Sequence, residues 1–145
     1  MTDHVRKQIR DAAVTALNGL TTTGSRVYPS VVYPMQDNNL PGLRVDTNDE
    51  EIQAPDVGKM LDRTLKLTVQ ACVKETVTYN DTIDTIIKEV EVAIAANQTI
   101  GGAKNVLLTA IKIEPSGEAE KPIMVATMTF DVPYFTMQGT PTVAL

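Results

Sequence analysis

The stretch RTLKLTVQACVKET, residues 63–76, decides the fold that this sequence predicts. Within it, polar or small side chains alternate with apolar ones at Leu65, Leu67, Val69, Ala71 and Val73. Successive side chains of a strand point to opposite faces of a sheet, so this period of two predicts a half-buried strand. Cys72 falls on the polar face, where we expect a structural thiol rather than a nucleophile.

Downstream of this strand the pattern predicts a helix and then a hairpin. Residues 80–97, NDTIDTIIKEVEVAIAAN, repeat apolar side chains at helical spacing, and Asn80 is the expected N-cap. Two strands are then predicted at 106–114 and 122–135, joined by a hairpin loop at 115–121. At about 3.3 Å per residue the second strand is longer than a small domain is wide, so we expect one end to project.

Upstream, a second amphipathic helix is predicted over residues 3–18, with Thr2 as its N-cap. Residues 26–35, RVYPSVVYPM, favour a strand but contain two prolines, which cannot donate to a ladder. An edge or broken strand is therefore expected there. A short strand follows at 43–47.

The order of these elements predicts an α+β fold, with a mostly antiparallel sheet and two helices packed on one face. The length of 145 residues is sufficient for one core, and we assign residues 1–136 to a single domain. Residues 137–145 show no periodicity, so we expect a C-terminal tail that is mobile until a partner binds it.

Composition excludes several functional classes. The net charge is −5 and the 13 Lys and Arg residues are scattered, which argues against a phosphate-binding surface for nucleic acid. A single cysteine cannot form an internal disulfide. No apolar stretch is long enough to span a bilayer, and no signal peptide is evident. We expect a protein that folds in a reducing cytoplasm without a membrane anchor.

The segment DTNDEE, residues 46–51, places four carboxylates within six positions. A metal site, a catalytic acid cluster and a solvated loop are the alternatives. A calcium loop that starts at Asp46 requires glycine where Glu51 stands and glutamate where Val57 stands, so the motif fails. Acid–base catalysis requires one carboxyl in an apolar pocket, and this polar stretch predicts none. We expect a solvated or partner-facing acidic loop whose candidate residues are Asp46, Asp49, Glu50 and Glu51.

Other catalytic motifs are missing from the sequence. The single histidine, His4, lies near the N-terminus, and none of the three serines stands in a nucleophile-elbow pattern. The glycine pair at 101–102 lacks the spacing of a phosphate-binding loop, and clusters of Cys and His that could bind zinc do not occur. The sequence therefore predicts no enzymatic activity and no cofactor.

Four pieces of the chain, in this order, carry a resemblance to a known family: LNGLTTTGSRVYPSVVYPM (17–35), LPGLRV (40–45), YNDTIDTIIKEVEVAI (79–94) and MVATMTFDVPYFT (124–136). Together they resemble the tail terminator, or minor tail protein U-like, family of long-tailed bacteriophages. The resemblance extends over residues 5–136 and rests on the order of elements rather than on a catalytic signature.

The resemblance implies a structural role. Members of that family form a hexameric ring on the head-proximal end of the tail tube, stop polymerisation of the tube protein and join the tail to the head. The implied partners are further copies of the chain, the tail tube protein and a head-completion or neck protein. DNA would pass through the lumen without specific binding. The implied location is the virion tail, after assembly in the host cytoplasm.

A ring subunit needs two complementary surfaces, and strand addition at a sheet edge can supply one of them. We expect such edges at residues 26–35 or at the ends of 122–135. The alternatives that stay open are a head-completion or neck connector, a small ligand-binding or enzymatic α+β domain, and a dimeric domain of cellular origin.

Overall fold

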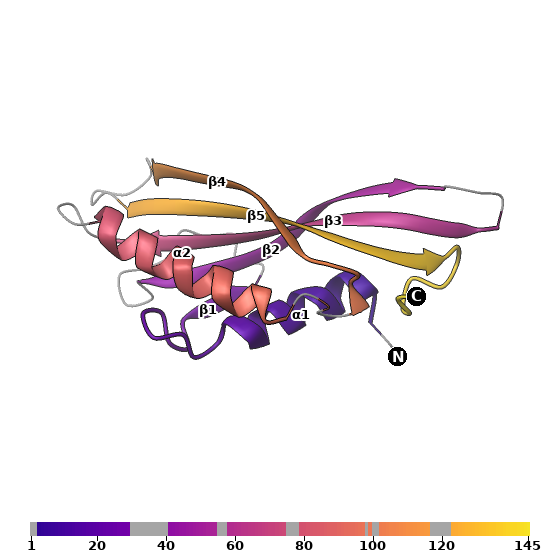
Figure 1. Cartoon of the computed structure of the whole chain (residues 1–145), viewed down its shortest axis with the longest axis horizontal. Coiled ribbons are helices and arrows are strands. Elements are labelled where there is room, and N and C mark those ends of the chain that lie inside the picture. The colour runs from indigo at the N-terminus through magenta and orange to yellow at the C-terminus, as the bar shows by residue number, and fades with distance from the viewer. Residues whose placement is uncertain are drawn as a thin grey trace.

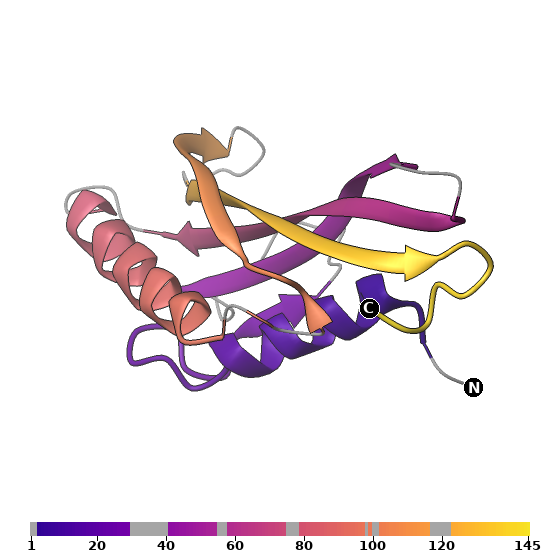
Figure 2. The same cartoon turned by 45° about the vertical axis from the view of Figure 1, so that its right-hand side comes forward.

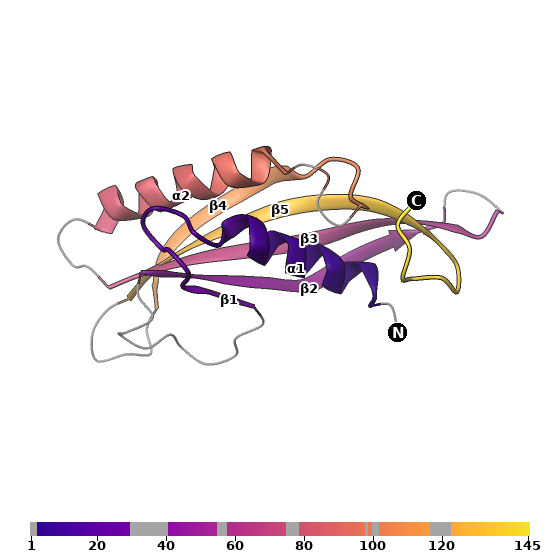
Figure 3. The same ribbon diagram turned by 90° about the horizontal axis from the view of Figure 1, so that it is seen from below.

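The computed structural model describes residues 3–29, 41–54, 58–74, 79–97, 99, 102–116 and 123–145. The helices and strands are α1 (Val5–Leu17), β1 (Val27–Pro29), β2 (Gly42–Gln53), β3 (Met60–Val73), α2 (Tyr79–Ala95), β4 (Leu107–Ser116) and β5 (Ile123–Met137). They form an α+β fold, as predicted, in which both helices lie on the same side of one sheet (Figures 1 and 3).

The sheet has the strand order β1-β2-β3-β5-β4. All pairs are antiparallel except that of β1 with β2, which is parallel. β1 is the edge strand predicted near residue 26, whereas residues 30–35 of that prediction lie outside the described part of the chain. The other expected edge is at the ends of 122–135. β5 is paired with β3 from Met124 to Met137 and with β4 from Ile123 to Asp131, so among the residues that the structure describes only its C-terminal end, from Val132, lacks a paired strand on the β4 side.

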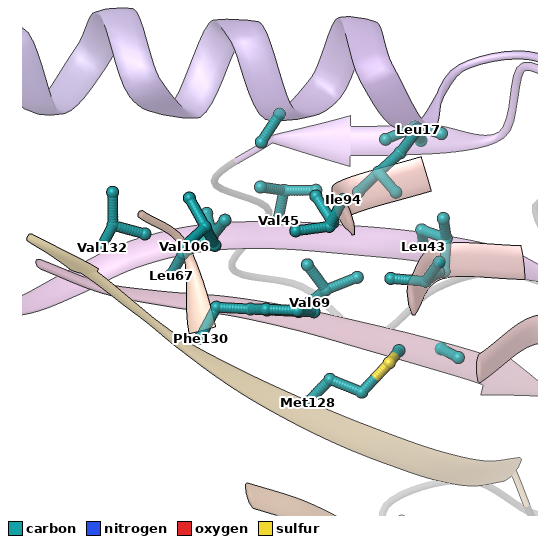
Figure 4. Packing of buried hydrophobic residues seen from close by; sticks show 14 of the residues in the cluster. Leu17, Leu43, Val45, Leu67, Val69, Ile94, Val106, Met128, Phe130 and Val132 are labelled. Carbon is teal, nitrogen blue, oxygen red and sulfur yellow. The ribbon is translucent and has the colours of Figure 1, made fainter. Parts of the chain in front are cut away.

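The core lies between the helices and the covered face of the sheet. The alternating residues of β3 point toward the helices and are fully buried from Leu65 to Ala71, as their period of two predicted. They meet the apolar stripes of α1 and α2, and Figure 4 shows Leu17 and Ile94 near Leu43 and Val45 of β2. The core is almost entirely aliphatic, and burial of its side chains is the main stabilising contribution.

The helices begin at other residues than the predicted caps. The N-cap of α1 is His4, whose Nδ1 accepts a hydrogen bond from the backbone N–H of Arg6 at 3.0 Å. Thr2 lies outside the described residues. α2 begins at Tyr79, so Asn80 lies within the helix and does not cap it.

Each of the strands β2 and β4 contains an irregularity of register. In β2 it lies between Asp46 and Asp49, and in β4 between Leu108 and Ala110. The two are at nearly the same level of the sheet, because both flank the central pair of Leu67 with Phe130. Bulges bend and twist a strand, and the sheet twists strongly in this region (Figure 1).

Beyond the bulges, the ends of β2, β3 and β5 extend past the helices as a three-stranded arm (Figure 1). The long strand thus projects at one end, as its length predicted. The C-terminal residues, for which we predicted a mobile tail, turn back from the arm toward the start of α1 (Figure 2). There the backbone N–H of Val5 donates to Pro141 O at 2.9 Å, and that of Leu145 donates to Phe135 O at 2.9 Å.

Candidate functional site

The acidic segment lies within strand β2 and not in a loop. β2 was predicted to end near Thr47 but continues to Gln53, so all four candidate carboxylates belong to a paired strand. The bulge reverses the alternation of faces, because two residues there occupy the place of one. Glu50 therefore points to the helix side, together with buried Val45, whereas Asp49 and Glu51 point to the face that the helices leave uncovered.

Glu50 is the centre of a buried polar network at the base of the arm. Its carboxylate accepts a 2.5 Å hydrogen bond from the Tyr134 hydroxyl and pairs at 3.2 Å with Nη1 of Arg63. The side chain of Glu50 is only 5% exposed and that of Arg63 only 11%. Arg63 also donates through Nε to the buried Thr136 hydroxyl at 2.9 Å, and Arg6 of α1 approaches Glu50 at 3.7 Å.

This network is closed and structural in character. Burial, and then the hydrogen bond to Glu50, raise the pKa of Tyr134 well above its usual range, so the phenol stays protonated and donates. The guanidinium of Arg63 lies 5.9 Å from the centre of the Tyr134 ring, within cation–π range. Since each described polar group here has a partner inside the domain, Glu50 is removed from the partner-facing set that the sequence suggested.

The uncovered face of the sheet carries the other three candidate residues. Asp49 and Glu51 are exposed and Asp46 is half-buried. Next to them, Lys66 of β3 forms an ion pair with Asp131 of β5. That hydrogen bond raises the pKa of Lys66, and the negative charges of Glu51 and Asp49 raise it further. Around Asp49 and Glu51 this part of the face is therefore solvated and acidic, and Lys66 beside them is already paired.

Two long strand edges lack a paired strand among the described residues. β4 is paired only with β5, so its other edge is open from Leu107 to Ser116. β1 covers the edge of β2 only at residues 43–45, which leaves residues 46–53 open. By contrast, the far end of β5 is covered, since Lys104 N–H donates to Pro133 O at 2.8 Å and Leu145 N–H to Phe135 O.

The groups that could perform chemistry have structural roles. Cys72 is buried beside Ile123, and burial raises the pKa of its thiol to about 11. Burial, and the positive charges of Arg6 and Arg63, lower the pKa of His4, which suits its role as an acceptor at the N-cap. Within the described ranges, no group of three or more His, Cys, Asp or Glu residues is placed to hold a metal ion.

A surface depression with a volume of about 540 Å³ lies between the ends of α1 and α2. Small and polar side chains line it, among them Ala12, Thr15 and Asn97. It contains no titratable side chain among the described residues and is wide open, so it offers no convergent polar groups for a small molecule. None of the described helices is both long enough and apolar enough to cross a membrane.

Comparison with known proteins gives a likeness of fold. No protein-family model and no curated protein sequence matches the chain. Among solved structures, a chain of the virion of a native gene transfer agent (GTA) particle superposes with a TM-score of 0.50. The match covers 90% of this chain and 92% of that chain at 16% sequence identity. At this identity the likeness shows a shared fold.

Sequence reasoning missed the partners of Glu50, although one signal was present. Arg63 stands two residues before Leu65, in the phase of the buried side chains of its strand, and Tyr134 is likewise in phase with Phe130 and Val132. A buried arginine requires a carboxylate or several acceptors. The phase of Arg63 could therefore have indicated that one of the nearby acids points inward.

Proposed function

We propose that this protein is a structural subunit of a phage-like virion and, more specifically, a tail terminator. In this role copies of the chain form a hexameric ring on the head-proximal end of the tail tube, end its polymerisation and form the joint to the head. The observation that carries the proposal is the likeness of fold, over nearly the full length of both chains, to a chain of a gene transfer agent virion. The element order that resembles the terminator family supports the finer assignment.

A non-enzymatic, structural role is part of this proposal, and the likeness to a virion chain supports it. The thiol and the imidazole are committed to structure, and the surface depression holds no catalytic constellation. What the structure does offer is a projecting three-stranded arm and two open strand edges, which suit assembly. The proposed partners are other copies of the chain, the tail tube protein and a head-completion or neck protein.

The acidic face of the sheet has a place in this proposal. Asp46, Asp49 and Glu51 lie on the uncovered face, and a carboxylate-rich wall would repel DNA that passes through the lumen. Reversal of Asp49 and Glu51 to lysine should leave the fold intact, because both side chains are exposed. If tail length and head joining are unchanged in that variant, the face has no role in either process. The matched control reverses two exposed acids of α2 beyond its first turn, Asp84 and Glu91.

A head-completion or neck connector is the second candidate, because the same likeness to a virion chain supports it equally. The partner distinguishes the two roles. A terminator binds the end of the tail tube and limits its length, whereas a connector on the head side binds the portal assembly.

The first experiment is the native mass by light scattering over a concentration series, followed by electron microscopy. A hexamer whose fraction increases with protein concentration, and which appears as a ring in micrographs, supports the terminator role. A closed dimer at every concentration contradicts a ring. If the protein stays monomeric at every concentration, the next assay adds it to polymerising tail tubes and measures their length. Tubes of unchanged length contradict the proposal.

A further inference from the structure

The two open edges of the sheet differ from ordinary surface strands. Unpaired strand edges recruit other strands, and proteins that stay monomeric usually shield them. On β4 the side chains of Leu107, Ile111 and Ile113 are 60%, 44% and 39% exposed, and on the open part of β2 Ile52 is 51% exposed. Edges that carry exposed aliphatic side chains are suited to bury them against a partner.

We infer that β4 of one copy pairs with residues 46–53 of β2 in the next copy, so that the sheet continues from subunit to subunit. The inference rests on the proposed ring and names its contact. The strand directions agree with it. β2 and β4 are the two ends of a run of antiparallel pairs, β2-β3-β5-β4, so β4 is itself antiparallel to β2. A neighbouring copy with its sheet in the same orientation therefore presents β4 antiparallel to β2, which repeats the pairing found throughout the rest of the sheet.

The unequal lengths of the open edges require a stagger between copies. Within one subunit, Lys112 of β4 pairs with Thr127 of β5, which pairs with Gln70 of β3, which in turn pairs with Arg44 of β2. Lys112 and Arg44 are therefore at the same level of the sheet. β1 already occupies the edge of β2 at that level, so the neighbour's β4 must shift toward the arm. A stagger of this kind accompanies closure of a sheet around an axis. The occupied and open parts of β2 thus fix the direction of the stagger, and closure of the copies into a ring is what the proposed function requires of it.

Side chains at the proposed contact are complementary. With the helix sides aligned, a shift toward the arm brings Lys112, 74% exposed and paired at 3.5 Å with Glu114 of its own strand, level with Asp49 and beside Glu51 on the uncovered face. The same shift brings Glu114 level with Asp46, so Lys112 would lie among three carboxylates. On the other face Ile111 and Ile113 approach the α1 helix of the next copy, which lies along β2 through contacts of Arg10 with Thr47 and Arg6 with Glu50. Burial of the exposed isoleucines and the approach of Lys112 to Asp49 therefore favour a second copy of this chain as the occupant of the edge.

Paired cysteines test the contact directly. Asp49→Cys and Lys112→Cys change two exposed side chains, and the native Cys72 is buried, so a short bismaleimide should react only at the new positions. The double variant is expected to give a ladder of crosslinked species that ends at the hexamer. A mixture of the two single variants should give dimers and nothing larger, because each copy then has one reactive surface. The matched control joins Asp49→Cys with Lys88→Cys, which lies on α2 and should give no ladder.

The outcomes separate the contact from the proposed function. Rings in micrographs of the unmodified protein, without a ladder in the double variant, would overturn the contact and leave the ring in place. Dimers from the Lys112→Cys variant alone would show that β4 pairs with β4, which also overturns it. A protein that stays monomeric and uncrosslinked at every concentration refutes the contact, and the terminator role then depends on the tube-capping assay.

Discussion

Replacement of Glu50 by alanine should destabilise the protein more than any other single change in the acidic segment. The substitution leaves the guanidinium of Arg63, 11% exposed, without its carboxylate, and leaves the Tyr134 hydroxyl without an acceptor. Removal of one partner of a buried ion pair costs about 3–5 kcal/mol. Arg63 keeps its hydrogen bond to Thr136 and reaches some solvent, so we expect a loss near the lower limit, about 3 kcal/mol.

Urea unfolding measures this loss. With a slope of about 1.5 kcal/mol per molar urea, in the range usual for small proteins, the midpoint should fall by about 2 M. The matched control is Glu51→Ala, which removes an exposed carboxylate from the adjacent position and should change the free energy of unfolding by no more than about 0.5 kcal/mol. Equal midpoints for the two variants would refute the reasoning, because Glu50 would then contribute no more than a solvated acid.

The double variant Glu50→Leu/Arg63→Met provides a second check on the same network. A buried ion pair exchanged as a unit for apolar side chains of similar volume is often neutral or stabilising. The double variant removes the unpaired charge but still leaves the Tyr134 hydroxyl without an acceptor. We therefore expect it to be more stable than Glu50→Ala by about 1–2 kcal/mol. If it is as unstable as the single variant, packing at this site, and not the unpaired charge, causes the loss.

Three further predictions concern the thiol, the helix cap and the C-terminal segment. Since burial raises the pKa of Cys72 to about 11, its reaction with a thiol-specific chromogenic reagent at pH 8 should be roughly a hundredfold slower than in urea. The folded state holds the pKa of His4 below its unfolded value of 6.5, so the stabilising contribution of the His4 cap is present above that pH and is lost as the pH falls. In thermal melts the protein should therefore lose about 0.5–2 kcal/mol of stability between about pH 7 and 5. The variant His4→Asn should not show this loss, because the asparagine cap does not titrate. A methyl group at Gly102 would lie 2.7 Å from Cβ of Ala144, at a residue with φ +89°, so Gly102→Ala should lower the melting temperature and speed carboxypeptidase digestion. With a mobile tail the strained φ would still lower the melting temperature, but the rate of digestion would not change.

Much of the fold could be predicted because its elements carry strong patterns. The alternation in β3 and the apolar stripe of α2 follow directly from burial on one face, and the structure buries those residues. The C-terminal segment could not be placed in this way. It is held by backbone hydrogen bonds such as that from Val5 to Pro141, and backbone groups are the same in every residue. A segment positioned by its backbone leaves no period in the sequence.

The helix starts show a different limit. Asn80 has the side chain of a good N-cap but lies one residue inside α2, and His4 caps α1 with an imidazole nitrogen that propensity ranks below Ser, Thr, Asp and Asn. A difference of one residue in a helix start costs little free energy, so the packing of the apolar stripes decides the position. Caps chosen by propensity alone are therefore the least certain part of a helix prediction.

The acidic segment shows why a candidate site needs the register as well as the composition. Its four carboxylates look equivalent in the sequence, but the bulge between Asp46 and Asp49 exchanges the faces of everything beyond it. Without that bulge, Asp49 and Glu51 would point to the helices and Glu50 to solvent. With it, one acid meets the buried Arg63 and its neighbours stay in water beside the open edge. The same irregularity that stabilises the arm through Glu50 thus leaves Asp49 free to meet Lys112 of a second copy, so one acid of the pair serves the fold and the other serves the proposed assembly.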